Sequence, residues 1–361
     1  MEFFNILYTI NITFILFNIF NIPIKYYLII FGHFVLIFLL NDVLFSAHYM
    51  PDQFRYFNTA STIRETFDFT LANYYTEGGN LLYASLLFAL FPIPYIHSLF
   101  SLAMINFMLY TLIFIFLYKK EILQENALLF YLLFPSFAIY AGVALRDIWI
   151  LFFMIISIYL LYKEKLIFSI IFSLPLLWIK YQNFYIYILS LFVFQILKKG
   201  SFFSFRTFIK LIFSIGLFYI VLSLVSIDTL NLIRYNMYIE DGGKAEYYIP
   251  LQTYSDLIFE GILGAFYMIL KPLPWESTSA LQLFQSFENI FVFYLIYKII
   301  KEQLIVKDKF INFLLIYFFI AMMIYGIIVF NYGTAARYRF TFELIFIVFS
   351  MNILQKKVKK K

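Results

Sequence analysis

Long apolar runs, separated by short polar segments, constrain this chain more than any other feature of its sequence. A helix of about 20 apolar residues crosses the hydrocarbon core of a bilayer. Hydrophobic residues make up 63% of the 361 residues and charged residues 13%, whereas a soluble domain carries about 25% charge. A soluble fold of this length has too little interior to bury so much apolar surface. The sequence therefore predicts an all-α, polytopic transmembrane helical bundle.

We expect a single integral-membrane domain over residues 1–361, with about 11 spans and a range of roughly 10 to 13. The candidate segments are 3–20, 26–46, 80–95, 97–118, 127–144, 148–162, 166–179, 183–197, 208–227, 257–270, 284–298, 310–330 and 340–355. Segment 80–95 contains Pro92 and Pro94, and segment 257–270 contains Glu260 and runs into Lys271. Both are short, so we expect interfacial or re-entrant helices there.

Lysine clusters set the expected orientation, because basic residues are enriched in cytoplasmic loops. They place the basic tail 356–361 in the cytoplasm and make 47–79 and 228–256 outer loops. The alternative is that 80–95 crosses the membrane and 47–79 is cytoplasmic. In the first solution 17 of 20 lysines lie inside, but six of seven arginines lie outside. These are Arg55, Arg64, Arg146, Arg234, Arg337 and Arg339. The rigid guanidinium fork suits phosphate and carboxylate, so outward arginines indicate an anionic ligand.

Two outer segments combine acids with arginines. In the stretch 51–60, Asp52 and Arg55 share a face if the loop begins as a helix. Asp52 is then a candidate general base and Arg55 a candidate phosphate ligand; the alternative is a local ion pair that orders the loop. Arg146 and Asp147 lie between two apolar segments, where unused charge is costly. They are candidate substrate-binding residues, and the alternative is an ion pair in a tight turn.

Two further segments place single charges at span ends. Lys180 follows Trp178 and is either a substrate ligand or a side chain that snorkels to the interface. The stretch Lys271-Pro-Leu-Pro-Trp275-Glu276 combines two helix-ending prolines with a charge pair. Glu276 is a second candidate catalytic acid or base, and the alternative is a rigid elbow at the membrane surface.

The segment 331–340 is the best phosphate candidate. Gly333 allows close approach of the backbone, and Arg337 and Arg339 can donate to several oxygens of a pyrophosphate. The alternative is an anchor for anionic lipid headgroups. The loop 228–256 is rich in tyrosines and acids, which suit either stacking on sugars or a solvated loop.

Metal and cofactor motifs are missing from the sequence. Cysteine is absent, and the three histidines are scattered without metal-ligand spacing. No phosphate-cradling glycine loop or nucleophile elbow occurs. The sequence thus predicts neither a metal nor a cofactor. The basic residues gather at span ends, which does not favour nucleic acid as a partner.

Taken in order, these motifs resemble bacterial multi-span glycan enzymes: the oligosaccharide repeat-unit (O-antigen-type) polymerases and related GT-C glycosyltransferases. The resemblance rests on Asp52-Gln-Phe-Arg-Tyr56, Pro135-Ser136, Ala144-Leu-Arg-Asp147, Pro272-Leu-Pro-Trp275, Asn331-Tyr-Gly-Thr334 and Arg337-Tyr-Arg339. It departs from the family in lacking large outer loops and in the stretch Phe340-Thr-Phe-Glu343, where a proline-containing span start is typical.

The resemblance implies metal-independent, inverting sugar transfer at the outer, periplasmic face of a bacterial inner membrane. The donor would be a polyprenyl-(pyro)phosphate-linked sugar and the acceptor a glycan, with other polysaccharide-assembly proteins as possible partners. Asp52 would act as the base, and Arg146, Arg337 and Arg339 would engage the donor's phosphates.

Two other classes of protein fit parts of the pattern. A flippase for lipid-linked oligosaccharides would use the same arginines, and predicts charges buried mid-span on several helices together with internal repeats. A structural scaffold would have no need of outward Arg-Asp pairs at span ends. Because the charges cluster at outer span ends, the sequence favours an enzyme that works at one face.

Overall fold

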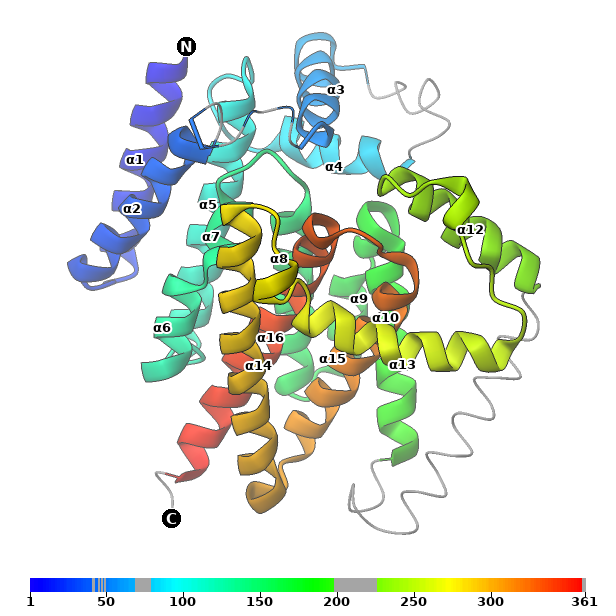
Figure 1. The fold of residues 1–361 in the computed structure, drawn as a ribbon. Coiled ribbons are helices and arrows are strands. Elements are labelled where there is room, and N and C mark those ends of the chain that lie inside the picture. The colour runs from blue at the N-terminus through cyan, green and yellow to red at the C-terminus, as the bar shows by residue number, and fades with distance from the viewer. Residues whose placement is uncertain are drawn as a thin grey trace. The chain divides into compact units, whose positions relative to one another are not determined.

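The computed structural model describes residues 1–40, 43, 44, 46, 48, 50–68, 79–197 and 226–358. Within these ranges the regular structure is helical (Figure 1), which confirms the predicted all-α class. The chain packs as two compact units, Met1–Phe184 and Tyr185–Lys361. Each unit is described by itself below, and the expectation of a single membrane domain stays a prediction.

Unit 1 is built around one almost fully buried helix, α5. Its helices are α1 (Glu2–Ile19), α2 (Ile24–Leu40), α3 (Asp52–Thr66), α4 (Gly79–Leu90), α5 (Leu99–Lys119), α6 (Glu125–Leu133), α7 (Pro135–Ala141), α8 (Asp147–Tyr162), α9 (Leu166–Ser173) and the first part of α10 (Leu176–Leu197). Helix α5 contacts α1, α2, α3, α7 and α8, and 78% of its most apolar window is buried. Because neighbours surround it, α5 is apolar on all sides.

The segment 127–144 is not one continuous helix, contrary to the expectation from its composition, and its crossing of the membrane stays a prediction. Helix α6 ends at Leu133, and α7 begins at Pro135. Proline fits the first turn of a helix but not its interior, because it lacks an N–H and clashes with the preceding turn. The chain therefore divides at Phe134, whose extended backbone separates two short helices.

The predicted segments 166–179 and 183–197 also differ from the helices of the structure. Helix α9 ends at Ser173, next to Pro175, and α10 then runs from Leu176 through a break at Lys180. The chain therefore breaks twice, once before Pro175 and once at Lys180, and the second break lies where the two predicted segments part. The predicted segment 208–227 lies almost wholly outside the described residues.

In its described residues, unit 2 contains the long helices α13 to α16 and a folded segment, 226–253, that the sequence predicts to lie outside the membrane. Its elements are the remainder of α10, α12 (Ile227–Glu240), η3 (Ala245–Tyr247), α13 (Tyr254–Leu270), η4 (Pro274–Glu276), α14 (Ala280–Val306), α15 (Lys309–Ile328) and α16 (Tyr332–Val358). In Figure 1, α13 lies across the direction of α14. Helices α13 and α15 cross where Gly264 meets Gly326, and a Cβ added at Gly326 would lie 2.2 Å from the carbonyl carbon of Gly264. The two backbones touch because neither residue has a side chain.

Among the described residues, five helices are long and apolar enough to cross a membrane: α1, α5, α10, α14 and α15. These helices indicate a membrane protein, whereas the count of about 11 spans stays a prediction. The two short predicted segments, 80–95 and 257–270, form α4, with 12 residues, and α13, with 17. Both end just before a proline-containing turn, and α4 is only about 18 Å long, well short of the bilayer core.

Candidate functional site

The first predicted motif lies on α3 in unit 1. Helix α3 begins at Asp52, so Asp52 and Arg55 lie one turn apart on the same face. Asp52 is half-buried, while Arg55 is exposed. Among the described residues Arg55 makes no hydrogen bond or ion pair, so the alternative of a local Asp52–Arg55 ion pair is not what the structure shows.

A buried glutamine connects this helix to the second motif. Gln53 is 2% exposed, and its Oε1 accepts a hydrogen bond from the backbone N–H of Ala144 at 2.8 Å. That bond holds the first turn of α3, with Asp52 and Arg55, against the loop that leads to Arg146. Two motifs separated by about 90 residues of sequence are therefore parts of one region of unit 1.

The same loop is fixed from its other side by α5. The Nδ2 atom of Asn106 donates to the carbonyl oxygens of Val143 and Leu145, at 2.7 and 2.6 Å. Buried backbone groups need such partners, since an unpaired one costs about 1–3 kcal/mol. With Gln53 and Asn106 holding its backbone, the loop presents Arg146 from a fixed position.

Arg146 and Asp147 have different surroundings. Arg146 precedes α8, is half-buried, and makes no hydrogen bond or ion pair through its side chain within the described ranges. Asp147 is the first residue of α8 and only 3% exposed. A carboxylate there stabilises the positive end of the helix dipole. Arg146 is consequently the more available of the two for a substrate anion.

Lys180 is buried at a break in α10. Its backbone has φ −158° and ψ 77°, which is not helical, and its side chain belongs to a residue 6% exposed. The next turn is tied to α8, because Asn183 donates to the sulfur of Met154. Snorkelling to a surface is therefore not its conformation, and a substrate contact by Lys180 stays a prediction.

Three of the six arginines that the sequence predicts to face outward bind carbonyl groups at the ends of helices. Arg64 donates to Ala89, Phe91 and Ile93 where α4 ends; Arg234 to Ile327 where α15 ends; and Arg339 to Met268 and Lys271 where α13 ends. The last carbonyls of a helix have no partner within it, and a guanidinium supplies several donors at once. Half of the arginine asymmetry thus has a structural cause. Arg55 and Arg146 make no such bonds within the described ranges and stay candidate phosphate ligands, and phosphate binding by Arg337 stays a prediction.

Arg339 has the most protein partners of these three arginines. It is 1% exposed, and Nη1 donates to Met268 and Lys271 at 2.6 and 2.9 Å. Its Nη2 donates to Oδ1 of Asn289, and its Nε lies 3.7 Å from the carboxylate of Glu343, which is also buried. Every nitrogen of the guanidinium has a protein partner. Direct contact between Arg339 and a substrate phosphate stays a prediction, and the geometry favours a structural role.

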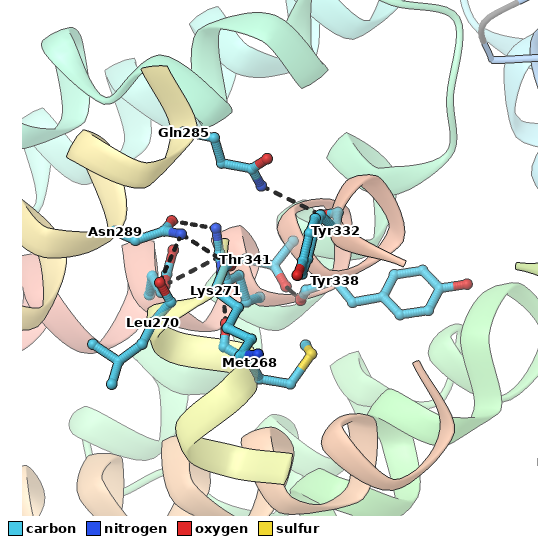
Figure 2. A network of polar contacts seen from close by, with 10 residues as sticks. Met268, Leu270, Lys271, Gln285, Asn289, Tyr332, Tyr338 and Thr341 are labelled. Atoms are coloured by element: carbon cyan, nitrogen blue, oxygen red, sulfur yellow. Dashed lines mark hydrogen bonds and ion pairs between the residues drawn. The ribbon is translucent and has the colours of Figure 1, made fainter. Parts of the chain in front are cut away.

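Asn289 completes this network from α14. Figure 2 shows its side chain directed at the carbonyl groups of Leu270 and Lys271, to which Nδ2 donates at 3.4 and 3.0 Å. Gln285, one turn earlier on α14, donates to the carbonyl of Tyr332 at 3.3 Å (Figure 2). Together these amides join the end of α13 and the start of α16 to one face of α14.

Glu276, the second candidate base, is held by two partners. Its Oε1 lies 2.9 Å from Nζ of Lys271, and its Oε2 accepts from the N–H of Leu273 at 3.0 Å. The Leu273 hydrogen bond, followed by the Lys271 ammonium, lowers the pKa of Glu276. Trp275 beside it is 79% exposed. This geometry supports the alternative of a surface elbow, and catalysis by Glu276 stays a prediction.

The glycine-containing stretch before Arg337 is a helix start, not an open phosphate loop. The Oδ1 atom of Asn331 accepts from the N–H groups of Gly333 and Thr334, at 2.8 and 3.1 Å, and so caps α16. These amides are already used, so the expected backbone approach to phosphate at Gly333 is not supported. Arg337 lies in the second turn of α16 and is half-buried.

Sequence reasoning missed the residues that hold the motifs in place. Gln53, Asn106 and Asn289 are each at most 2% exposed, and of these Asn106 is the lone amide of an apolar helix. The signal available was their burial cost: a lone amide in an apolar helix needs a partner. Within the described ranges no group of three or more His, Asp or Glu side chains gathers in a way that would hold a metal ion.

No protein-family model, curated protein or solved structure matches this chain. The resemblance to glycan polymerases and GT-C enzymes therefore rests on the short motifs alone.

Proposed function

We propose that the protein is a membrane glycosyltransferase that uses polyprenyl-(pyro)phosphate-linked sugars, and that unit 1 carries its reacting groups. One observation carries the proposal: the Gln53–Ala144 hydrogen bond brings the α3 turn bearing Asp52 and Arg55 together with the loop bearing Arg146. An acid and two available guanidinium groups then lie on adjoining, rigidly held segments.

The proposed chemistry is inverting transfer. Asp52 accepts the proton of an acceptor hydroxyl as its oxygen attacks the anomeric carbon of the donor sugar. The bond from that carbon to the phosphate oxygen breaks, and the phosphate leaves with the electron pair. Arg55 and Arg146 donate to the oxygens on which negative charge develops, which is where fixed donors lower the barrier most. Arginine supplies this charge in the proposal, so no metal is needed.

Within unit 2, Arg337 is proposed separately as a ligand for a lipid-linked phosphate. It lies in the second turn of α16, where its side chain is half-buried. The tyrosines of the outer segment 226–253 add ring faces suited to sugars, with Tyr247 68% exposed.

The test is the glycan made by cells that lack the protein and are then given back Asp52→Asn. We expect Asp52→Asn to insert in the membrane and to abolish transfer, with lipid-linked intermediates accumulating at the outer face. Single repeat units on the carrier indicate a polymerase, and a glycan lacking one sugar indicates a single-step transferase. An active Asp52→Asn protein contradicts the assignment of the base, and inhibition by chelators contradicts the metal-free chemistry.

A second candidate function, a lipid-linked oligosaccharide flippase, is favoured by one observation. Glu288, Arg339 and Glu343 are buried on α14 and α16, and transporters place ionisable groups inside their helix bundles. In this case Glu288→Gln or Glu343→Gln would make intermediates accumulate at the inner face. Asp52→Asn would leave transport intact.

A further inference from the structure

The outer segment Ser226–Thr253 is fastened to the junction between α15 and α16. Asp241, at the end of α12, makes two of the bonds: its Oδ2 accepts from the N–H of Phe330 at 2.8 Å, and its Oδ1 accepts from Oγ1 of Thr334 at 3.0 Å. Arg234 makes a third, from Nε to the carbonyl of Ile327 at 3.1 Å. One carboxylate therefore bridges the connection before α16 and the first turn of α16 itself.

Aromatic packing reinforces these bonds. The rings of Tyr238 and Phe330 lie edge to face with centroids 5.2 Å apart. The guanidinium of Arg234, which is 6% exposed, lies 5.8 Å from the ring of Phe330 and 6.0 Å from that of Tyr248. Cation–π contacts of this kind strengthen when they are shielded from water. The segment is thus packed against the junction rather than tethered by one bond.

The internal structure of the outer segment is equally well defined. Oδ1 of Asn231 accepts from the N–H of Leu251 at 2.8 Å, and Nδ2 of Asn231 donates to the carbonyl of Leu251 at 2.8 Å. Tyr248 donates to the carbonyl of Asn231 at 2.9 Å. Since both ends of the segment are tied together, Asp241 is offered to α16 from a fixed backbone.

Asp241 contacts the helix turn that precedes a candidate site residue, Arg337. Thr334 and Arg337 are three residues apart on α16, so they share a helix face. The carboxylate of Asp241 holds the side chain of Thr334 and the backbone N–H of Phe330. It therefore fixes the first turn of α16 and, through it, the turn that carries Arg337. Asn331 caps the amides of Gly333 and Thr334, and Gln285 of α14 holds the carbonyl of Tyr332, so Asp241 is the contact that the segment 226–253 makes to the first turn of α16.

We infer that Asp241 is a positioning residue for Arg337: it holds the start of α16 so that Arg337 meets a lipid-linked phosphate in a fixed orientation. The inference rests on the proposed function of Arg337 as a phosphate ligand. It adds that phosphate binding by Arg337 requires the outer segment 226–253, which contributes Asp241.

The test compares Asp241→Ala with Asp256→Ala in the purified full-length protein. Asp256 is a matched control, because it also accepts two backbone hydrogen bonds, from Gln252 and Thr253, but it caps α13 instead of α16. We expect hydrogen exchange of the amides in 330–336 to rise about tenfold in Asp241→Ala and to stay unchanged in Asp256→Ala. Unchanged exchange in Asp241→Ala overturns the inference.

A binding cycle tests the link to Arg337. Undecaprenyl phosphate is the probe, and its Kd is measured for wild type, Asp241→Ala, Arg337→Lys and the double variant. If Asp241 acts through Arg337, each single change weakens binding about tenfold, and the double variant is no weaker than Arg337→Lys alone. Additive losses overturn the positioning role. An unchanged Kd in Arg337→Lys overturns the proposed function of Arg337, while the exchange result still reports on the contact made by Asp241.

A disulfide offers a rescue that a general folding defect would not show. The chain has no cysteine, so the pair Asp241→Cys and Thr334→Cys is the sole thiol pair. Oxidation should restore both slow exchange and wild-type Kd, and reduction should remove both. Oxidised protein that retains a weakened Kd contradicts the inference.

Discussion

Arg146 in unit 1 and Arg339 in unit 2 are both predicted from the sequence to bind the donor's phosphates, yet they have opposite surroundings. Around Arg146, neutral amides from Gln53 and Asn106 hold the backbone and leave the guanidinium available. Around Arg339, the guanidinium itself holds the backbone, and it is fully buried. The comparison teaches that an arginine is available to a substrate when other residues satisfy the nearby helix ends.

The largest expected effect comes from Arg339→Met. This change leaves Glu343 buried without its charge partner and removes the donors to the end of α13. Breaking a buried ion pair costs about 3–5 kcal/mol, so we expect a strongly lowered Tm in detergent or failure to accumulate. The matched control is Arg55→Met, which replaces an exposed arginine. Equal Tm values for the two variants would remove the distinction between structural and available arginines.

A second prediction concerns the helix packing of unit 2 and changes no charged residue. Gly326→Ala places a Cβ against the backbone of Gly264, so α13 and α15 must move apart. Overpacking of this kind costs about 1–3 kcal/mol or more. The control is Gly32→Ala on α2, where a Cβ meets nothing within 4 Å, and where the better helix propensity of alanine adds up to about 1 kcal/mol of stability. Thermal unfolding of both variants measures the difference, and a stable Gly326→Ala protein would contradict the close crossing.

The comparison is sharpened by Arg146→Lys. The charge is kept, but the planar fork that binds phosphate through two hydrogen bonds is lost. We expect transfer to fall about tenfold to a hundredfold, equivalent to roughly 1.4–2.7 kcal/mol in the barrier, with Tm unchanged. Glycan synthesis in complemented cells and thermal unfolding of the purified protein check the two parts. A variant with full activity would exclude Arg146 from phosphate binding, and one with a lowered Tm would show that it is structural like Arg339.

The smallest effect concerns the surface elbow. The pKa of Glu276 is lowered from 4.5, first by the Leu273 N–H and then by Lys271. A depressed carboxyl pKa stabilises the fold above the unfolded pKa, and this contribution is lost as pH falls below 4.5 through the folded value. The pair is partly exposed, so the contribution is below about 1 kcal/mol. Unfolding measured against pH should show a smaller acid-induced drop in Glu276→Gln than in wild type.

The control for that measurement is Glu246→Gln. Glu246 is exposed, and it makes no hydrogen bond or ion pair within the described part of the chain. Its replacement should leave the pH profile of stability unchanged. An equal flattening in both variants would show that net charge, rather than the Lys271–Glu276 contact, sets the acid response.

Much of the helical content follows from the sequence, because apolar length and proline position are local properties. The start of α8 was predicted within one residue, and α3 begins at the aspartate that follows Pro51. For segment 127–144, apolar composition predicted one span, although Pro135 was a local signal for the start of a second helix. The Gly264–Gly326 crossing depends on two helices meeting in space, which no single segment encodes.

The candidate site was predicted less completely than the helices. The titratable residues were identified, but their roles depend on partners far away in sequence. Gln53 binds a residue 91 positions distant, and Arg339 binds one 71 positions distant. A pattern read along the chain cannot tell an arginine that caps a distant helix from one that faces a ligand. Buried amides such as Asn106 are the clue that was available, since each needs a partner.

The arginine caps also have a consequence for the order in which the chain is made. Arg64 precedes the carbonyl of Ala89 by 25 residues, whereas Arg339 follows that of Met268 by 71. The end of α4 thus finds its cap already synthesised, while the end of α13 waits roughly 4–14 s for the ribosome to reach Arg339. Exposed carbonyls are costly in lipid. We therefore expect α13 to settle at its final depth only after α16 has emerged.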